Sequence, residues 1–123
     1  MPTIMIVDDE ERIRKMYRLL FEQEGYTVIT ASNINDARRF LKIIQVNLVL
    51  LDINMGEFSG DILYEIIQCF HPGTKLIVSS VYSIDDQRSI MPKADDYFDK
   101  SEGNKKLLDK VRDVIGQDRA HWN

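Results

Sequence analysis

Short apolar runs alternate with stretches of helical periodicity along the whole chain. Five runs rich in branched or aromatic residues predict strands, at residues 3–7, 26–30, 46–51, 75–80 and 96–99. Apolar residues at helical spacing predict a helix after each strand, and Pro92 keeps the fourth, over residues 84–91, short. Five successive strand–helix units predict an α/β fold, with a doubly wound, five-stranded parallel sheet between two layers of helices.

Capping residues mark several of the predicted helix ends. Gly25 follows the first helical stretch, at a position where glycine commonly ends a helix. Ser32 or Asn33 is expected to cap the start of the second helix, and Ser101 the start of the last.

Length and composition restrict the function classes. The chain has 123 residues, enough for a single domain over residues 1–123, and a formal net charge of -4. Because nucleic acids and anionic membranes bind basic surfaces, this charge argues against both as direct partners. Cys69 is the only cysteine, which excludes an internal disulfide and fits a reducing compartment. Without a signal-peptide pattern or an apolar stretch of bilayer length, we expect a cytoplasmic protein.

Polar and charged residues follow the predicted strands at their carboxyl ends, where parallel sheets bind ligands. They are Asp8, Asp9, Asp52, Ser79, Ser80 and Lys100. Carboxylates brought within about 5 Å of one another repel by roughly 3 kcal/mol a pair at an effective dielectric constant of about 20. Because Lys100 supplies one positive charge, we expect a divalent cation beside it, and oxygen ligands favour Mg²⁺. Such a site would let Asp52 attack phosphorus and form an acyl phosphate.

Four short motifs together resemble the receiver domain of two-component response regulators. They are VDDE at residues 7–10, VLLDINM at 49–55 followed by Gly60, SS at 79–80, and DYFDK at 96–100. The resemblance covers essentially the whole chain and implies a flavodoxin-like fold. It also implies a phosphorylation-dependent signalling switch, which catalyses its own phosphorylation and dephosphorylation but is not an enzyme acting on an external metabolite.

The resemblance assigns roles to the acidic residues and to one amide. Asp52 resembles the phosphoacceptor, which takes its phosphoryl group from a sensor histidine kinase or a phosphotransfer domain and also contacts the metal ion. Asp9 resembles the direct ligand of Mg²⁺ or Mn²⁺, and Asp8 would bind the ion through water. Asn54 would give its backbone carbonyl to the same ion.

Other residues resemble the parts that respond to the phosphoryl group. Lys100 resembles the phosphate-contacting lysine. Ser80 resembles the switch hydroxyl, and the choice between it and the preceding Ser79 stays open. Tyr97 resembles the switch aromatic that turns inward, although packing alone would also explain a tyrosine here. The face of the fourth helix, fifth strand and fifth helix would then change its contacts with a downstream protein, a fused output domain or a second copy of the chain.

The sequence departs from the family pattern at several positions. Gly56 and Ser101 stand where proline is usual, and we predict a trans peptide between Lys100 and Ser101 because a cis bond before a non-proline residue costs about 3 kcal/mol. Ser80 and Lys100 are twenty positions apart (100 − 80), a couple fewer than usual. The fourth helix is therefore expected to be irregular or at most two turns long, with low amide-exchange protection over residues 82–94.

These departures keep a second hypothesis open, a degenerate receiver that binds partners without being phosphorylated. A phosphatase with an aspartyl-phosphate intermediate is disfavoured, because Asn54 stands where its DxD motif has the second acid. A flavin carrier is disfavoured too, since no hydroxyl-rich phosphate loop follows the first strand. The sequence does not distinguish a stand-alone receiver from a piece of a longer regulator.

Overall fold

The computed structural model describes residues 2–53 and 60–120 of the chain. The strands are β1 (Thr3–Val7), β2 (Thr27–Ala31), β3 (Leu48–Asp52), β4 (Lys75–Ser80) and β5 (Asp96–Asp99). The α-helices are α1 (Glu11–Gln23), α2 (Ile34–Ile43), α3 (Gly60–Phe70), α4 (Ile84–Ile90) and α5 (Asn104–Ala120), and a 3₁₀ helix, η1 (Lys100–Glu102), follows β5.

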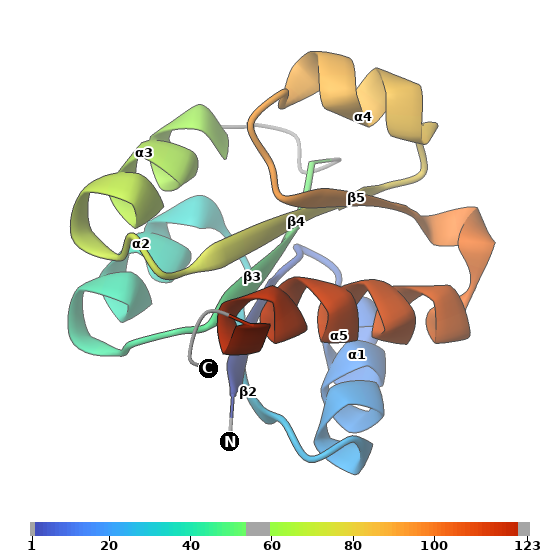
Figure 1. Cartoon of the computed structure of the whole chain (residues 1–123), viewed down its shortest axis with the longest axis horizontal. Helices are drawn as coiled ribbons and strands as arrows, with labels where there is room; N and C mark the ends of the chain where they lie inside the picture. The colour runs from blue at the N-terminus through green and yellow to red at the C-terminus, as the bar shows by residue number, and fades with distance from the viewer. Residues whose placement is uncertain (1, 54–59, 121–123) are drawn as a thin grey trace.

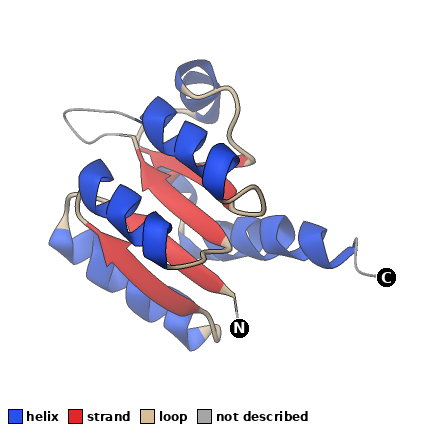
Figure 2. Ribbon diagram, turned by 90° about the vertical axis from the view of Figure 1, so that its left-hand side faces the viewer, coloured by secondary structure: helices blue, strands red, loops and turns tan. Residues whose placement is uncertain are grey.

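The strands form one parallel sheet in the order β2-β1-β3-β4-β5 (Figure 1). Helices α1 and α5 cover one face of this sheet, and α2, α3 and α4 pack on the other (Figure 2). The predicted doubly wound α/β fold is therefore confirmed. The strand order reverses between β1 and β3, and ligands of such sheets bind beside the carboxyl ends of the strands at this point.

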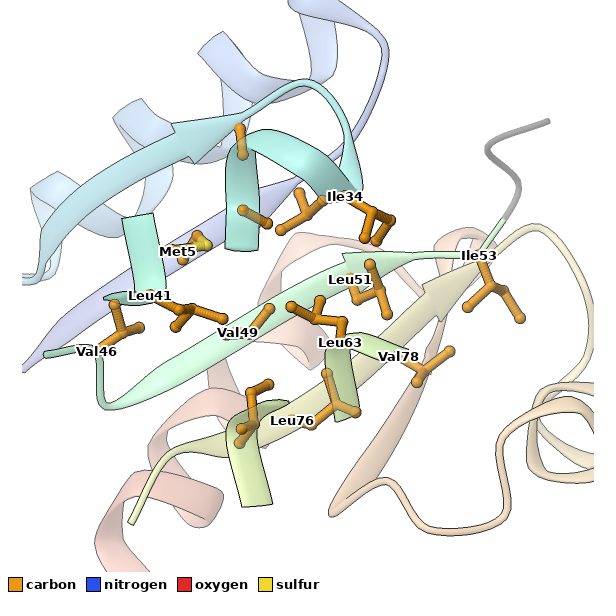
Figure 3. Packing of buried hydrophobic residues seen from close by; sticks show 14 of the residues in the cluster. Met5, Ile34, Leu41, Val46, Val49, Leu51, Ile53, Leu63, Leu76 and Val78 are labelled. Carbon is orange, nitrogen blue, oxygen red and sulfur yellow. The ribbon is translucent and has the colours of Figure 1, made fainter. Parts of the chain in front are cut away.

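Alternate residues of the strands feed two separate hydrophobic cores. Met5 and Val7 of β1 pack toward α2 and α3, in the cluster drawn in Figure 3. Ile4 and Ile6 point to the opposite face and pack with α1 and α5. All five residues of β3 are buried, as expected for a central parallel strand that is covered on both faces.

The helix ends agree with two of the three predicted caps. Gly25 ends α1 with a φ of 91°, a left-handed conformation that glycine adopts without strain. Asn33 caps α2, because its side-chain oxygen accepts a hydrogen bond from the Asp36 backbone at 2.8 Å. The prediction that Ser101 caps the last helix is wrong. Ser101 lies inside η1, and the chain turns again at Gly103, with a φ of 90°, before α5 begins at Asn104.

The predicted shortness of the fourth helix and the predicted trans peptide before Ser101 are confirmed. Helix α4 has seven residues, about two turns, and Ser83 caps it by accepting a hydrogen bond from the Asp86 backbone. No cis peptide occurs in the described part of the chain, so the Lys100–Ser101 bond is trans. The other departure from the family pattern, Gly56, lies outside the described residues.

Low exchange protection over residues 82–94 remains a prediction. Because a helix of two turns gains little stability of its own, we expect the amides of α4 to exchange about tenfold faster than those of the longer α2 and α5. Hydrogen–deuterium exchange followed by mass spectrometry measures this directly. Protection of α4 equal to that of α5 would contradict the prediction.

Candidate functional site

Two buried carboxylates mark the carboxyl ends of β1 and β3. Asp8 follows β1 and Asp52 ends β3, and both are almost completely removed from solvent. The beginning of α1 orients Asp8: one carboxylate oxygen accepts the Glu10 backbone N–H at 2.9 Å, and Arg14 donates to the Asp8 carbonyl at 2.8 Å. The predicted acids of these two neighbouring strands thus lie at the same edge of the sheet.

Lys100 joins both acids. Its Nζ lies 3.4 Å from Oδ2 of Asp8 and 3.5 Å from Oδ2 of Asp52. The ammonium therefore connects the ends of β1, β3 and β5, although its side chain comes from a position 92 residues away from Asp8. This arrangement is the juxtaposition that the sequence predicted for these three residues.

The turn that carries Lys100 is held by side chains instead of a proline. Asp99 accepts hydrogen bonds from the Ser101 backbone at 2.9 Å and from the Ser101 hydroxyl at 2.8 Å. Glu102 accepts the Asp99 backbone N–H at 3.1 Å, which completes a capping box around η1. Ser101 thus contributes to the trans turn that positions Lys100.

The electrostatic environment favours the charged form of Lys100. Burial alone lowers the pKa of its ammonium, since removal from water disfavours a charge. The carboxylates of Asp52 and Asp8 outweigh burial, and the pKa lies above its ordinary value. At neutral pH, Lys100 is therefore a fixed cation between the two acids.

A group of three carboxylates lies at the start of α1. Oxygens of Asp8, Asp9 and Glu10 come within 4.8 Å of one another, with Asp8 buried and the other two exposed. A set of carboxylate oxygens that is open to water on one side fits a hard divalent cation such as Mg²⁺ or Mn²⁺. Among the described residues, Asp52 is not a member of this group and reaches Asp8 through Lys100. Asn54 lies outside the described residues.

Sequence reasoning did not include Glu10 in the acidic group at the start of α1. Its place directly after two aspartates, at the point where the chain turns into α1, was the available signal. Neither Asp8 nor Asp9 is the N-cap of α1, because Glu10 occupies that position and makes no side-chain capping bond.

Both serines at the end of β4 are buried, and because strand residues alternate they point to opposite faces of the sheet. Ser79 pairs in register with Asp52, and its hydroxyl makes no hydrogen bond of good geometry among the described residues. The Ser80 hydroxyl accepts the Tyr82 backbone N–H at 3.0 Å. Neither arrangement decides which serine is the switch hydroxyl.

Tyr97 of β5 points inward. The residue is 4% exposed, and its hydroxyl donates to the Met91 carbonyl just after α4. The Arg88 guanidinium stands 5.1 Å from the centre of the ring, a cation–π distance. Tyr97 therefore connects β5 to both ends of the second turn of α4.

A second buried tyrosine, Tyr17, lies close to Lys100, Asp8 and Asp52. Burial raises the pKa of the Tyr17 hydroxyl, the positive charge of Lys100 lowers it, and the negative charges of Asp8 and Asp52 raise it further. Tyr17 recurs at the helical spacing typical of a core residue, and it is 4% exposed. Its nearness to the charged groups was not predictable from that pattern.

With this geometry in place, the similarity to known proteins can be stated. The sequence profile of the response regulator receiver domain matches residues 4–112. The chain belongs to the response regulator receiver domain family. The crystal structure of TrrA from Thermotoga maritima, in complex with Mg²⁺–BeF, superposes on this receiver domain with a TM-score of 0.81 at 33% identity, covering 93% of this chain and 99% of TrrA. A CheY-like receiver domain from Methanospirillum hungatei superposes with a TM-score of 0.86 at 27% identity, covering 98% of both chains.

Curated relatives of this receiver domain include regulators of greater length. The transcriptional regulatory protein CpxR of Klebsiella pneumoniae is 27% identical over 126 residues, which cover 100% of this chain and 52% of CpxR. The receiver domain thus spans about half the length of that relative. In the described part of the chain, no helix has both the length and the apolar character needed to cross a bilayer.

Proposed function

We propose that Asp52 of this receiver domain accepts a phosphoryl group from a phosphohistidine on a sensor histidine kinase or a phosphotransfer protein. One observation carries the proposal: the Lys100 ammonium lies 3.4 Å from Asp8 and 3.5 Å from Asp52, which brings the charged groups of three strand ends together. Phosphoryl transfer needs this kind of positioning and charge neutralisation more than it needs covalent chemistry from the protein.

In the transfer step, a carboxylate oxygen of Asp52 attacks phosphorus. The bond between phosphorus and the histidine nitrogen breaks, the electron pair stays with the imidazole, and an acyl phosphate forms on Asp52. Lys100 pairs with a phosphoryl oxygen, and Ser80 donates a hydrogen bond to another. Asp9, Asp52, the carbonyl of Asn54 and, through water, Asp8 would hold a divalent cation, which would supply the remaining neutralisation of charge on the phosphoryl oxygens.

The surface that would contact a downstream partner lies at the β5 edge of the sheet, opposite β2. Tyr97 contacts Met91 just after α4, and Ser80 bonds the Tyr82 backbone just before α4. The phosphoryl group therefore acts on the face formed by α4, β5 and α5. This face would contact a downstream protein, a fused output domain or a second copy in a homodimer. We place residues 1–123 in the cytoplasm as a single receiver domain without direct contact to nucleic acid or membrane.

A second candidate function is a degenerate receiver that binds partners without being phosphorylated. The two-turn α4 and the trans bond at Ser101 favour it, because both depart from the usual architecture near the phosphoryl site. The complete set of acids and Lys100 argues against it.

Removal of the metal ion tests the proposed function. The chain incubated with acetyl phosphate and Mg²⁺ is expected to gain one phosphoryl group, and EDTA is expected to reduce the rate by about a hundredfold or more, because Lys100 alone then faces the added charge. Intact-mass spectrometry measures the gain, and hydroxylamine, which cleaves acyl phosphates, identifies the linkage. A chain that gains no phosphate with Mg²⁺ would support the degenerate receiver instead.

A further inference from the structure

Gln87 is a completely buried polar residue in α4. Its Nε2 donates to two backbone carbonyls, that of Tyr82 at 2.9 Å and that of Phe98 at 2.8 Å. Because an amide nitrogen carries two protons, these bonds use its whole donor capacity. The side chain therefore ties the segment between β4 and α4 to strand β5.

Burial of the polar amide of Gln87 costs free energy of folding unless its hydrogen bonds compensate for it. Its Oε1 is buried without a hydrogen-bond partner among the described residues. A buried amide with an unsatisfied oxygen is less favourable than an apolar side chain of the same size. Packing alone would thus favour leucine or methionine at this position, and the donor bonds give glutamine its advantage.

Both carbonyls held by Gln87 lie two residues from groups of the proposed phosphoryl site. Tyr82 follows Ser80, and its backbone N–H donates to the Ser80 hydroxyl at 3.0 Å. Phe98 precedes Lys100 in the chain segment that brings the ammonium to Asp52. Gln87 therefore fixes the distance between the segment that carries the hydroxyl and the segment that carries the cation.

The bond from Tyr82 does not use the proton of the Ser80 hydroxyl. A hydroxyl has one proton and two lone pairs, so Ser80 can accept the Tyr82 N–H and still donate its own proton. The bond from Tyr82 restricts where that proton points. Gln87 holds the Tyr82 carbonyl, and the N–H that bonds Ser80 lies on the other side of the same Cα, so Gln87 restricts the orientation of Ser80 through the Tyr82 backbone.

We propose that Gln87 is a positioning residue for phosphoryl transfer to Asp52: it holds the Tyr82 backbone so that Ser80 meets the phosphoryl group opposite Lys100. The proposal rests on the proposed function, and it adds a residue that touches neither the phosphoryl group nor the metal ion. It also gives α4 a direct connection to the site through a side chain that belongs to the helix.

The test is the Gln87→Met variant of the full chain, which keeps the size of the side chain and removes both donors. Gln68→Met, at an exposed glutamine of α3, is the matched control. The initial rate of phosphorylation by acetyl phosphate with Mg²⁺ is expected to fall about tenfold in Gln87→Met, the factor that corresponds to one neutral hydrogen bond. The control is expected to react at the wild-type rate.

A double-mutant cycle separates positioning from a general loss of structure. If Gln87 acts through Ser80, then Ser80→Ala and the double variant Ser80→Ala/Gln87→Met react at the same rate. Multiplicative losses, or a Gln87→Met rate equal to wild type, would overturn the proposal. Where Gln87→Met does not fold, Gln87→Asn takes its place, because an amide one methylene shorter cannot reach both carbonyls.

Amide exchange at Tyr82 in the unphosphorylated chain gives a readout that does not depend on the proposed function. We expect NMR to show about tenfold faster exchange of this amide in Gln87→Met and no change in Gln68→Met. If the wild-type chain accepts no phosphate, the proposed function fails while this measurement still decides the placement of Ser80 by Gln87. Equal exchange in wild type and Gln87→Met would refute that placement.

Discussion

Replacing Asp52 by asparagine is expected to abolish phosphorylation by acetyl phosphate. The amide has no ionised oxygen to attack phosphorus, although its size and its position at the end of β3 are unchanged. The rate is expected to fall by a factor on the order of 10³ or more, as in other proteins that lose a nucleophile. Intact-mass spectrometry after incubation with acetyl phosphate and Mg²⁺ shows the loss as a missing mass gain.

The matched control for this variant is Asp113→Asn, which makes the same change in charge at an exposed position of α5. It is expected to be phosphorylated as fast as the wild-type chain. Phosphorylation of Asp52→Asn at the wild-type rate would place the acceptor on another residue. Peptide mapping would then show which carboxylate carries the phosphoryl group.

Replacing Lys100 by methionine is expected to weaken phosphorylation and to strengthen metal binding. Without the ammonium, no fixed cation faces the phosphoryl oxygens, and the rate falls by about a hundredfold. The same change removes the positive charge that lies between Asp8 and Asp52, so the affinity for Mg²⁺ rises about tenfold. Isothermal titration calorimetry measures the affinity, and mass spectrometry measures the rate.

Lys105→Met is the control for Lys100→Met, since it removes an exposed lysine from α5. It is expected to change neither the phosphorylation rate nor the affinity for Mg²⁺.

The pH dependence of stability adds an independent check. Because the pKa of Lys100 is raised above its ordinary 10.5, its stabilising contribution is complete below that pH and is lost as the pH rises through the raised value. An unchanged Mg²⁺ affinity in Lys100→Met would show that the ammonium lies outside the metal pocket.

The sheet was predictable from the sequence because buried parallel strands are continuous apolar runs. The start of β3 was not, and it lies at Leu48 rather than at residue 46. Asn47 explains part of the difference, since its side chain accepts the Thr3 backbone N–H at 2.8 Å and occupies the turn before the strand. The Val46 carbonyl accepts a bond from the Thr74 hydroxyl. Such long-range contacts are not visible in local periodicity.

The grouping of Asp8, Asp52 and Lys100 was predictable because parallel strands bring their carboxyl ends to the same edge of a sheet. The contacts of Gln87 and of Tyr97 were not, because each depends on how α4 lies against β5. Glutamine in a polar stretch gives no sign of burial. The prediction that Ser101 caps the last helix failed for a similar reason. The capping side chain in this turn is Asp99, two residues earlier, which accepts a hydrogen bond from the Ser101 backbone.

The position of β3 in the sheet has a consequence for engineering. Asp52 belongs to a strand with a neighbour on each side and helices above and below, whereas β5 has one neighbouring strand and borders α4. The proposed phosphoacceptor therefore lies on an enclosed central strand, whereas the proposed output face lies at an edge of the sheet. A chimera that exchanges residues 81–99 with those of another receiver would be expected to inherit the donor's effector choice while keeping its own acceptor.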